Sequence, residues 1–147
     1  MKIVLFLLML FLGVILSLHL TMNAQVGVML KNSRMANALF WSIGAVTALI
    51  VGATAWDVAV FDKLKTVPLW LLTAGVMGAL LVFGIAWTIP QIGAGPAFVI
   101  MIAGQVLTGL IFSHYGLMGS PVEPFSLMKG LGVLLLMAGV SLITFVK

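Results

Sequence analysis

The chain has 147 residues, of which 63% are hydrophobic and 7% are charged, and its formal net charge is +4. Soluble domains carry roughly 25% charged residues, so this composition excludes a soluble domain and indicates an integral membrane protein. The seven basic residues form no cluster, which gives no support to nucleic-acid binding. Because cysteine is absent, disulfides and thiolate chemistry are excluded as well.

Five long apolar runs follow one another along the chain, and each reaches the ~20 residues that cross hydrocarbon as a helix. None alternates apolar and polar residues, as the strands of a membrane barrel do. We therefore predict an all-α integral membrane protein with a single transmembrane domain, residues 1–147. Its spans are expected at about residues 3–30, 34–56, 67–89, 94–115 and 126–146. The connections are too short for a soluble domain, so function is expected within the membrane or at its edges.

The first run also resembles a secretory signal peptide, because it starts with Met1 and Lys2 and reaches a possible cleavage region at Asn23-Ala24-Gln25. Apolar residues 26–30 follow that region directly. This continuation favours one helix that extends to Lys31.

The stretch SLHLTMNAQ places four polar side chains inside the first span. His19 and Asn23 are four residues apart and share one helix face, whereas Thr21 and Gln25 share nearly the opposite face. The two pairs are therefore expected to have different neighbours. For Thr21, a hydrogen bond to the carbonyl one turn back is the favoured interpretation.

His19 and Asn23 have two open interpretations. At 1.5 Å per residue, His19 lies about 25 Å from one end of the helix and about 18 Å from the other, too deep to reach water easily. An ionisable group at such depth indicates a functional site, and histidine can exchange a proton near neutral pH. The alternative is an interhelical hydrogen-bond pair that holds the bundle together.

Two further residues are candidates for a cavity wall. Gln105, in IAGQVLTG, is a mid-span amide flanked by small residues that leave room beside it. Trp41 lies one turn inside the second span and could face a substrate as an aromatic wall, although anchoring at the interface is the commoner role. Trp70 and Trp87, near span ends, are interpreted as interfacial anchors.

The segment TIPQIGAGP, with Pro90, Gly93, Gly95 and Pro96, predicts a helix break and a tight hairpin between the third and fourth spans, because proline removes a backbone donor and glycine tolerates unusual dihedrals. Small residues recur at helical spacing and favour close helix packing in lipid. They include Gly44, Ala48 and Gly52, then Gly75 and Ala79, then Gly109 and Ser113.

Signals of catalysis are weak. The three carboxylates, Asp57, Asp62 and Glu123, lie near span ends or in loops, which counts against proton exchange at a buried carboxylate. No zinc or iron ligand spacing, phosphate loop or dinucleotide fingerprint is present, so neither a cofactor nor an enzyme is expected. A membrane enzyme acting on lipid headgroups would require His114 or Glu123 to be essential.

The distribution of Lys and Arg gives almost no preference for one orientation. With the N-terminus inside, Lys2, Lys63, Lys65 and Lys129 face Lys31, Arg34 and Lys147 across the membrane. Two chains with five spans each, inserted in opposite orientations, would form an inverted repeat with a site at their interface. The alternative is that one basic residue decides the orientation of every copy.

Six segments, in order, resemble the YdcZ-like branch of the drug/metabolite transporter superfamily. They are SLHLTMNAQVG, NALFWSIGA, PLWLLTAGVMGA, IPQIGAGPAF, IAGQVLTGLIFSHYGLMG and KGLGVLLLMAGVSL. The resemblance implies five spans per chain and pairing into an antiparallel ten-helix unit. Members of that branch often have glutamine where this chain has His19, which leaves proton coupling and substrate class open. The related small multidrug exporters have four spans and a mid-membrane glutamate, which this chain lacks.

Our hypothesis is a secondary transporter of a small polar or amphipathic metabolite in the bacterial inner membrane. It would work by alternating access in an antiparallel homodimer, or with a paralogous partner, surrounded by membrane lipid. His19, Asn23, Gln105 and Trp41 are the predicted substrate-binding residues. The rival hypothesis is a non-transporting scaffold or accessory subunit of a larger membrane complex, in which the polar residues hold the assembly together.

Overall fold

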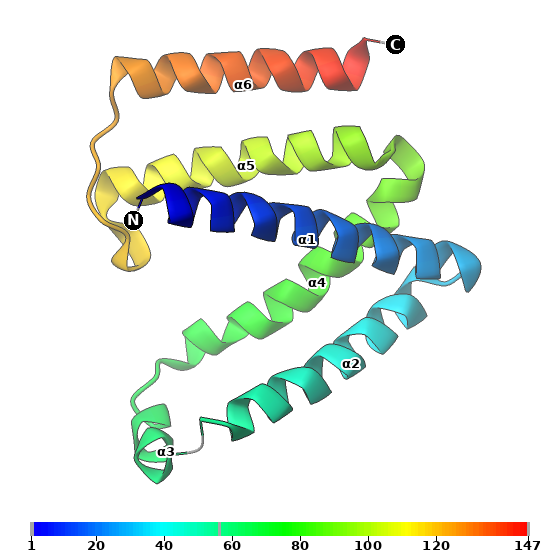
Figure 1. Ribbon diagram of the computed structural model, residues 1–147, viewed down its shortest axis with the longest axis vertical. Coiled ribbons are helices and arrows are strands. Elements are labelled where there is room, and N and C mark those ends of the chain that lie inside the picture. Colours follow the sequence, from blue (N-terminus) through cyan, green and yellow to red (C-terminus); the bar gives the residue numbers. More distant parts are fainter. Residues whose placement is uncertain (1, 56, 147) are drawn as a thin grey trace. The chain divides into compact units, whose positions relative to one another are not determined.

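The computed structural model describes residues 2–55 and 57–146, and every regular element in these residues is a helix. Figure 1 shows the helices in chain order. Five of those described are long and apolar enough to cross a membrane, which confirms the predicted all-α class and five spans. The elements are α1 (Lys2–Met29), α2 (Ser33–Ala53), α3 (Val58–Leu64), α4 (Leu69–Ile92), α5 (Ala94–Tyr115), the 3₁₀ turn η1 (Leu117–Gly119) and α6 (Leu127–Phe145).

The predicted spans agree with these helices to within three residues wherever the structure describes them. The first span is one continuous helix that passes through Asn23-Ala24-Gln25 without interruption. The second ends at Ala53, because Thr54 closes it and its backbone N–H turns back to the carbonyls of Val51 and Gly52. The predicted end of this span, Trp56, lies outside the described residues.

Three of the helices have a short polar residue as N-cap. Its side chain accepts a hydrogen bond from a backbone N–H that has no partner inside the helix. Asn32 accepts from Met35 at the start of α2, and Ser126 accepts from Lys129 at the start of α6. Asp57 accepts from the Ala59 N–H and begins α3, a short helix in a segment for which the sequence predicted only a connection.

The helix break predicted within TIPQIGAGP is present, and it is confined to Gly93. Helix α4 continues through Pro90 to Ile92, and Gly93 alone separates it from α5. Gly93 has φ +88° and ψ 155°, a conformation essentially restricted to glycine, so this residue ends the helix and Pro90 does not. Pro96 lies in the first turn of α5, where a missing N–H costs nothing.

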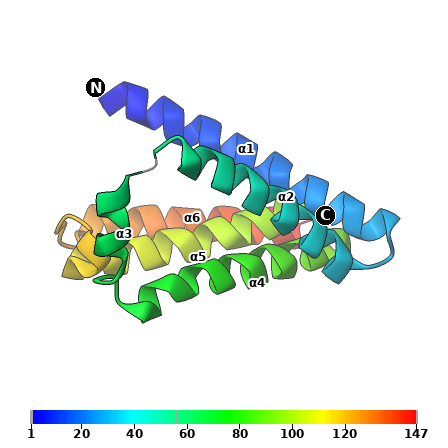
Figure 2. The same ribbon diagram turned by 90° about the horizontal axis from the view of Figure 1, so that it is seen from below.

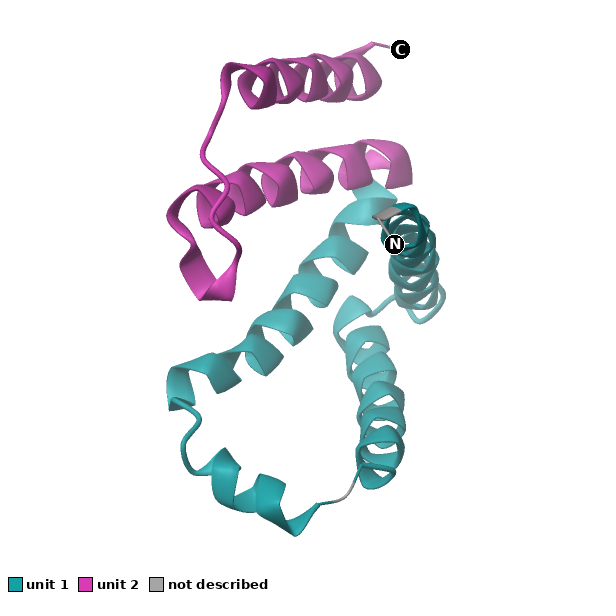
Figure 3. Cartoon of the chain, turned by 60° about the vertical axis from the view of Figure 1, so that its left-hand side comes forward, with its two compact units in different colours: residues 1–91 teal, residues 92–147 magenta. Residues whose placement is uncertain are grey.

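The described residues form two compact units, residues 1–91 and 92–147, which Figure 3 shows in different colours. In the first unit, α1 and α2 pack against each other and form a V whose apex is the turn between them (Figures 1 and 2). In the second unit, α5 packs along α6. The assignment of residues 1–147 to one transmembrane domain stays a prediction.

Buried apolar side chains are few in the part of the chain that the structure describes. Eight are buried, among them Leu20 and Ala24 of α1, Ala36 of α2 and Val140 of α6. Most of the apolar surface is left for lipid or for another polypeptide, as expected of membrane helices, whose association does not rest on burial from water.

We predict that Gly93→Ala lowers the free energy of unfolding by about 1–3 kcal/mol, because alanine is strained at φ +88°. Unfolding in detergent, followed by circular dichroism, measures the change. The matched control is Gly95→Ala in the first turn of α5, where an added Cβ meets open space. This control should keep or raise the stability, by up to about 1 kcal/mol. Equal losses in both variants would contradict the role assigned to Gly93.

Candidate functional site

The backbones of α1 and α2 approach each other closely near the turn that joins them, and this contact fixes how the two helices are aligned. A Cβ built on Gly27 would lie 3.3 Å from the Cα and Oγ of Ser33, so the absence of a side chain at this position lets the helices meet. Farther from the turn, the rings of His19 and Phe40 lie 5.4 Å apart between centroids, with their planes tilted by 55°. These two contacts define an antiparallel register that continues for at least two turns of each helix.

Asn23 is the one polar side chain that is buried among the described residues, with 0% of its surface exposed. Neither its Oδ1 nor its Nδ2 has a hydrogen-bond partner in the described chain. Leu20 and Ala24, its neighbours on α1, are buried as well. A buried amide without partners costs about 1–3 kcal/mol, so this position carries an unused donor and an unused acceptor in an apolar surrounding.

The two polar pairs of α1 have different environments, as the sequence predicted. His19 is half-buried one turn before Asn23, whereas Thr21 and Gln25 are exposed. The Thr21 hydroxyl donates to the carbonyl of Ser17 at 2.8 Å, which confirms the predicted backbone bond. The face of α1 that carries His19 and Asn23 is therefore the less exposed of the two.

Contacts between α2 and α4 hold Trp41. Its ring lies over Gly78, where a Cβ would be 3.4 Å from the indole Cη2, and 40% of the residue remains exposed. One turn earlier, Asn37 donates from Nδ2 to the carbonyl of Ala79 at 3.2 Å. Trp41 is thus held by a packing contact and is neighboured by a polar link between the same two helices.

Asn37 is a candidate that the sequence analysis missed. Its Nδ2 is bonded to Ala79, but its Oδ1 is buried and has no partner among the described residues. The sequence contained the signal, since Asn37 precedes Trp41 by four residues and therefore shares its face. The first unit thus holds two carboxamides with unused oxygen atoms.

Gln105, the fourth predicted site residue, lies on α5 in the second unit and is exposed. The structure brings His19 and Phe40 together, and it brings Trp41 together with α4. A common site for Gln105 with His19 and Asn23 stays a prediction.

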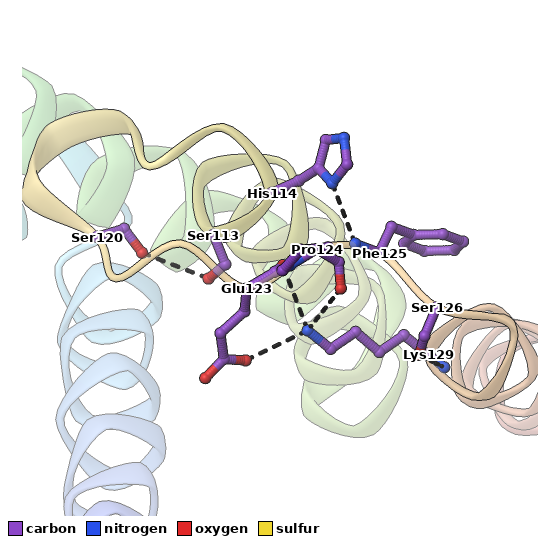
Figure 4. Close-up of polar contacts among 8 residues, drawn as sticks. All are labelled: Ser113, His114, Ser120, Glu123, Pro124, Phe125, Ser126 and Lys129. Carbon is purple, nitrogen blue, oxygen red and sulfur yellow. Dashed lines mark hydrogen bonds and ion pairs between the residues drawn. The ribbon is translucent and has the colours of Figure 1, made fainter.

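The polar residues of the second unit are engaged in a different way (Figure 4). His114, at the end of α5, accepts a hydrogen bond from the Phe125 N–H at its Nδ1, with 3.0 Å between the atoms. Lys129 of α6 donates to Glu123 Oε2 at 3.2 Å and to the carbonyl of Pro124 at 3.2 Å. Both candidate residues of the enzyme hypothesis, His114 and Glu123, thus have partners that tie the loop 116–126 to its flanking helices.

His114 and Phe125 of this network also line an apolar groove of about 730 Å³ between α5 and α6. Its walls include Leu107, Ile111 and Leu131, and His114 is its main polar residue. No group of three or more metal-ligating side chains occurs in residues 2–55 and 57–146. Among the described residues, buried side-chain atoms without a hydrogen-bond partner occur on Asn23 and Asn37 in the first unit and on Thr144 of α6 in the second.

Comparison with known proteins relates the chain as a whole to membrane export. The model of one protein family, described as "Putative inner membrane exporter, YdcZ", matches residues 4–142, nearly the whole chain. Comparisons with curated proteins and with solved structures find no match.

We predict that Asn23→Leu raises the free energy of unfolding by about 1–3 kcal/mol, because a leucine of similar size buries no unpaired amide. Asn37→Leu should lower it by about 1 kcal/mol, because this change removes the bond to Ala79. Unfolding of the purified variants in detergent measures both effects. A large loss of stability in Asn23→Leu would mean that Asn23 has a partner in the assembled protein.

Proposed function

Because the chain belongs to the YdcZ family of inner-membrane exporters, we propose that it is a secondary transporter that moves a small polar or amphipathic metabolite across a bacterial inner membrane. Five membrane-spanning helices and a match over residues 4–142 support a multi-pass inner-membrane exporter. Substrate binding by residues of the first unit is the further step of this proposal.

The observation that carries the proposal is the unpaired amide of Asn23. A group that costs stability is retained where something other than folding uses it, and a substrate with both a donor and an acceptor would satisfy Nδ2 and Oδ1 together. His19, one turn away on the same face, can donate, accept or exchange a proton. We assign Asn23 and His19 to the substrate, with Trp41 as an aromatic wall and Gln105 as a further polar contact.

We further propose that the working unit is an antiparallel homodimer, or a dimer with a paralogous partner. Glycines at the predicted packing positions support this assembly, because a Cβ built on Gly44, Gly52, Gly75 or Gly109 meets nothing within 4 Å. These positions are thus open to a helix from another chain, and small residues allow the close approach that drives association in lipid.

Alternating access then requires a pivot that permits helices to move relative to one another. Gly93 is suited to this task, because it is the one residue between α4 and α5 and has a conformation outside the helical region. Hinges are typically a few residues at element ends that absorb changes in φ and ψ. The motion would expose the polar site to one side of the membrane at a time.

We predict that Asn23→Ala and His19→Ala each reduce export about tenfold or more, because each removes a polar contact worth about 1–3 kcal/mol to the bound substrate. The measurement is metabolite profiling of the medium from cells that produce each variant at equal membrane levels. The metabolites enriched by the wild-type protein should return to the level of cells without it.

Thr21→Val is the matched control, because Thr21 lies on the exposed face and its hydroxyl bonds only its own helix. It should export as well as the wild type. If the protein enriches no metabolite and Asn23→Ala dissolves a larger membrane complex, the scaffold hypothesis replaces transport.

We predict dual topology in whole cells. The chain has no cysteine, so single cysteines introduced as Lys2→Cys and Lys147→Cys can be labelled by a reagent that does not cross the membrane. An antiparallel homodimer requires partial labelling at both ends. Complete labelling at one end and none at the other would exclude it, and would leave a paralogous partner as the source of the opposite orientation.

A further inference from the structure

A second feature of the first unit lies at the turn between α1 and α2, away from Asn23. A polar pocket of about 400 Å³ is lined by Lys31, Asn32, Ser33, Arg34, Phe83 and Trp87. Two of these residues are cations, two are aromatic and none is acidic. The pocket is therefore electropositive and has an aromatic wall supplied by α4.

The cations of this pocket have no acidic partner within the described residues. Of the three carboxylates in the sequence, Asp62 pairs with Lys65 and Glu123 pairs with Lys129, while Asp57 accepts the Ala59 N–H. Lys31 and Arg34 are only three residues apart, so their like charges repel each other unless an anion lies between them.

The backbone conformation at Lys31 is unusual for a lysine. Lys31 has φ +50°, and the turn has the hydrogen bonds of a Schellman motif, from Lys31 N to Val28 O at 3.1 Å and from Asn32 N to Gly27 O at 3.0 Å. Glycine is the usual residue at this position, because a side chain is strained there. Lys31 thus occupies a backbone position at which glycine would be less strained.

The position along the chain selects the kind of anion. The turn follows directly on the apolar α1 and precedes α2, so it lies where membrane helices meet the headgroup region. Trp87 is 57% exposed, and an indole ring is suited to that depth. Arginine binds phosphate oxygens in a bidentate manner, and lysine binds them as a point charge.

We propose that the pocket formed by Lys31, Arg34, Phe83 and Trp87 binds a phosphate group, carried by an anionic lipid headgroup or by a free phosphate. Lys31 and Arg34 hold the phosphate oxygens, and the aromatic rings cover the adjoining apolar part of the ligand. The site is separate from the proposed substrate residues, and its test does not depend on transport.

The lipid arm of the test uses native mass spectrometry of the full chain with equimolar phosphatidylglycerol and phosphatidylcholine. The wild type should prefer phosphatidylglycerol, and Lys31→Gly or Arg34→Gln should each lower that preference about fivefold, which corresponds to one cation near a membrane surface. Lys63→Gln, which removes an exposed cation of α3 in the same unit, should keep the preference.

Lys31→Gly removes the charge without straining the backbone, because glycine readily adopts φ +50° and the turn should keep its stability. Should this variant fail to fold, Lys31→Asn removes the charge with a residue that also tolerates a left-handed backbone. Either variant therefore separates the charge of Lys31 from the shape of the turn.

The free-anion arm uses inorganic phosphate and the protein in discs of phosphatidylcholine alone. Broadening of the ³¹P resonance that Lys31→Gly and Arg34→Gln abolish would identify a free phosphate as the ligand, whereas preference for phosphatidylglycerol without broadening would identify a lipid headgroup. The proposal is overturned if the wild type shows neither a preference for phosphatidylglycerol nor broadening by phosphate. It is also overturned if either effect persists when Lys31→Gly and Arg34→Gln are combined.

Discussion

The tight turn between α1 and α2 is the constraint on which the first unit depends. Three residues separate the two helices, and Gly27 lets the backbone of Ser33 approach where any side chain would crowd it. Because the turn sets the register, His19 meets Phe40 two turns farther along the pair. The same turn holds Lys31 in a left-handed conformation beside Arg34. One local geometry thus positions both the polar face of α1 and the electropositive pocket.

The polar side chains around the loop 116–126 are bonded, whereas, among the described residues, two carboxamides of the first unit have unpaired atoms, as does the Thr144 hydroxyl of α6. His114 of α5 accepts a hydrogen bond from the Phe125 N–H, and Lys129 of α6 donates to the Glu123 carboxylate and to the carbonyl of Pro124, so these bonds tie the loop 116–126 to both flanking helices. In the first unit, Asn23 has no bonding partner and Asn37 has a free oxygen among the described residues. Satisfied polar groups stabilise a fold, whereas a buried unsatisfied one costs stability. The substrate site is proposed in the first unit because Asn23 has both an unused donor and an unused acceptor there, one turn from His19.

Apolar burial contributes little to this chain, and the reason lies in the solvent. Lipid tails are as apolar as leucine, so helices gain nothing from hiding such residues and associate through small residues and polar links instead. Two contacts of this kind join α2 and α4. Asn37 donates a hydrogen bond to the carbonyl of Ala79, and the Trp41 ring packs against Gly78. The glycines Gly44 of α2, Gly75 of α4 and Gly109 of α5 make no such contact in the described chain, and a Cβ at each would meet nothing within 4 Å.

The sequence by itself determined the helical class and the five spans, because a helix that crosses hydrocarbon needs about 20 consecutive, mostly apolar residues. It also carried the family resemblance. Its periodicity also separated the His19 and Asn23 face from that of Thr21. The tertiary structure decided what depends on neighbours from other helices: the burial of Asn23 without a partner, the bond of Asn37, and the pocket that Phe83 and Trp87 complete around Lys31. It also narrowed the break predicted within TIPQIGAGP to Gly93, because a proline near the end of a helix costs few bonds, whereas the backbone at Gly93 leaves the helical region altogether.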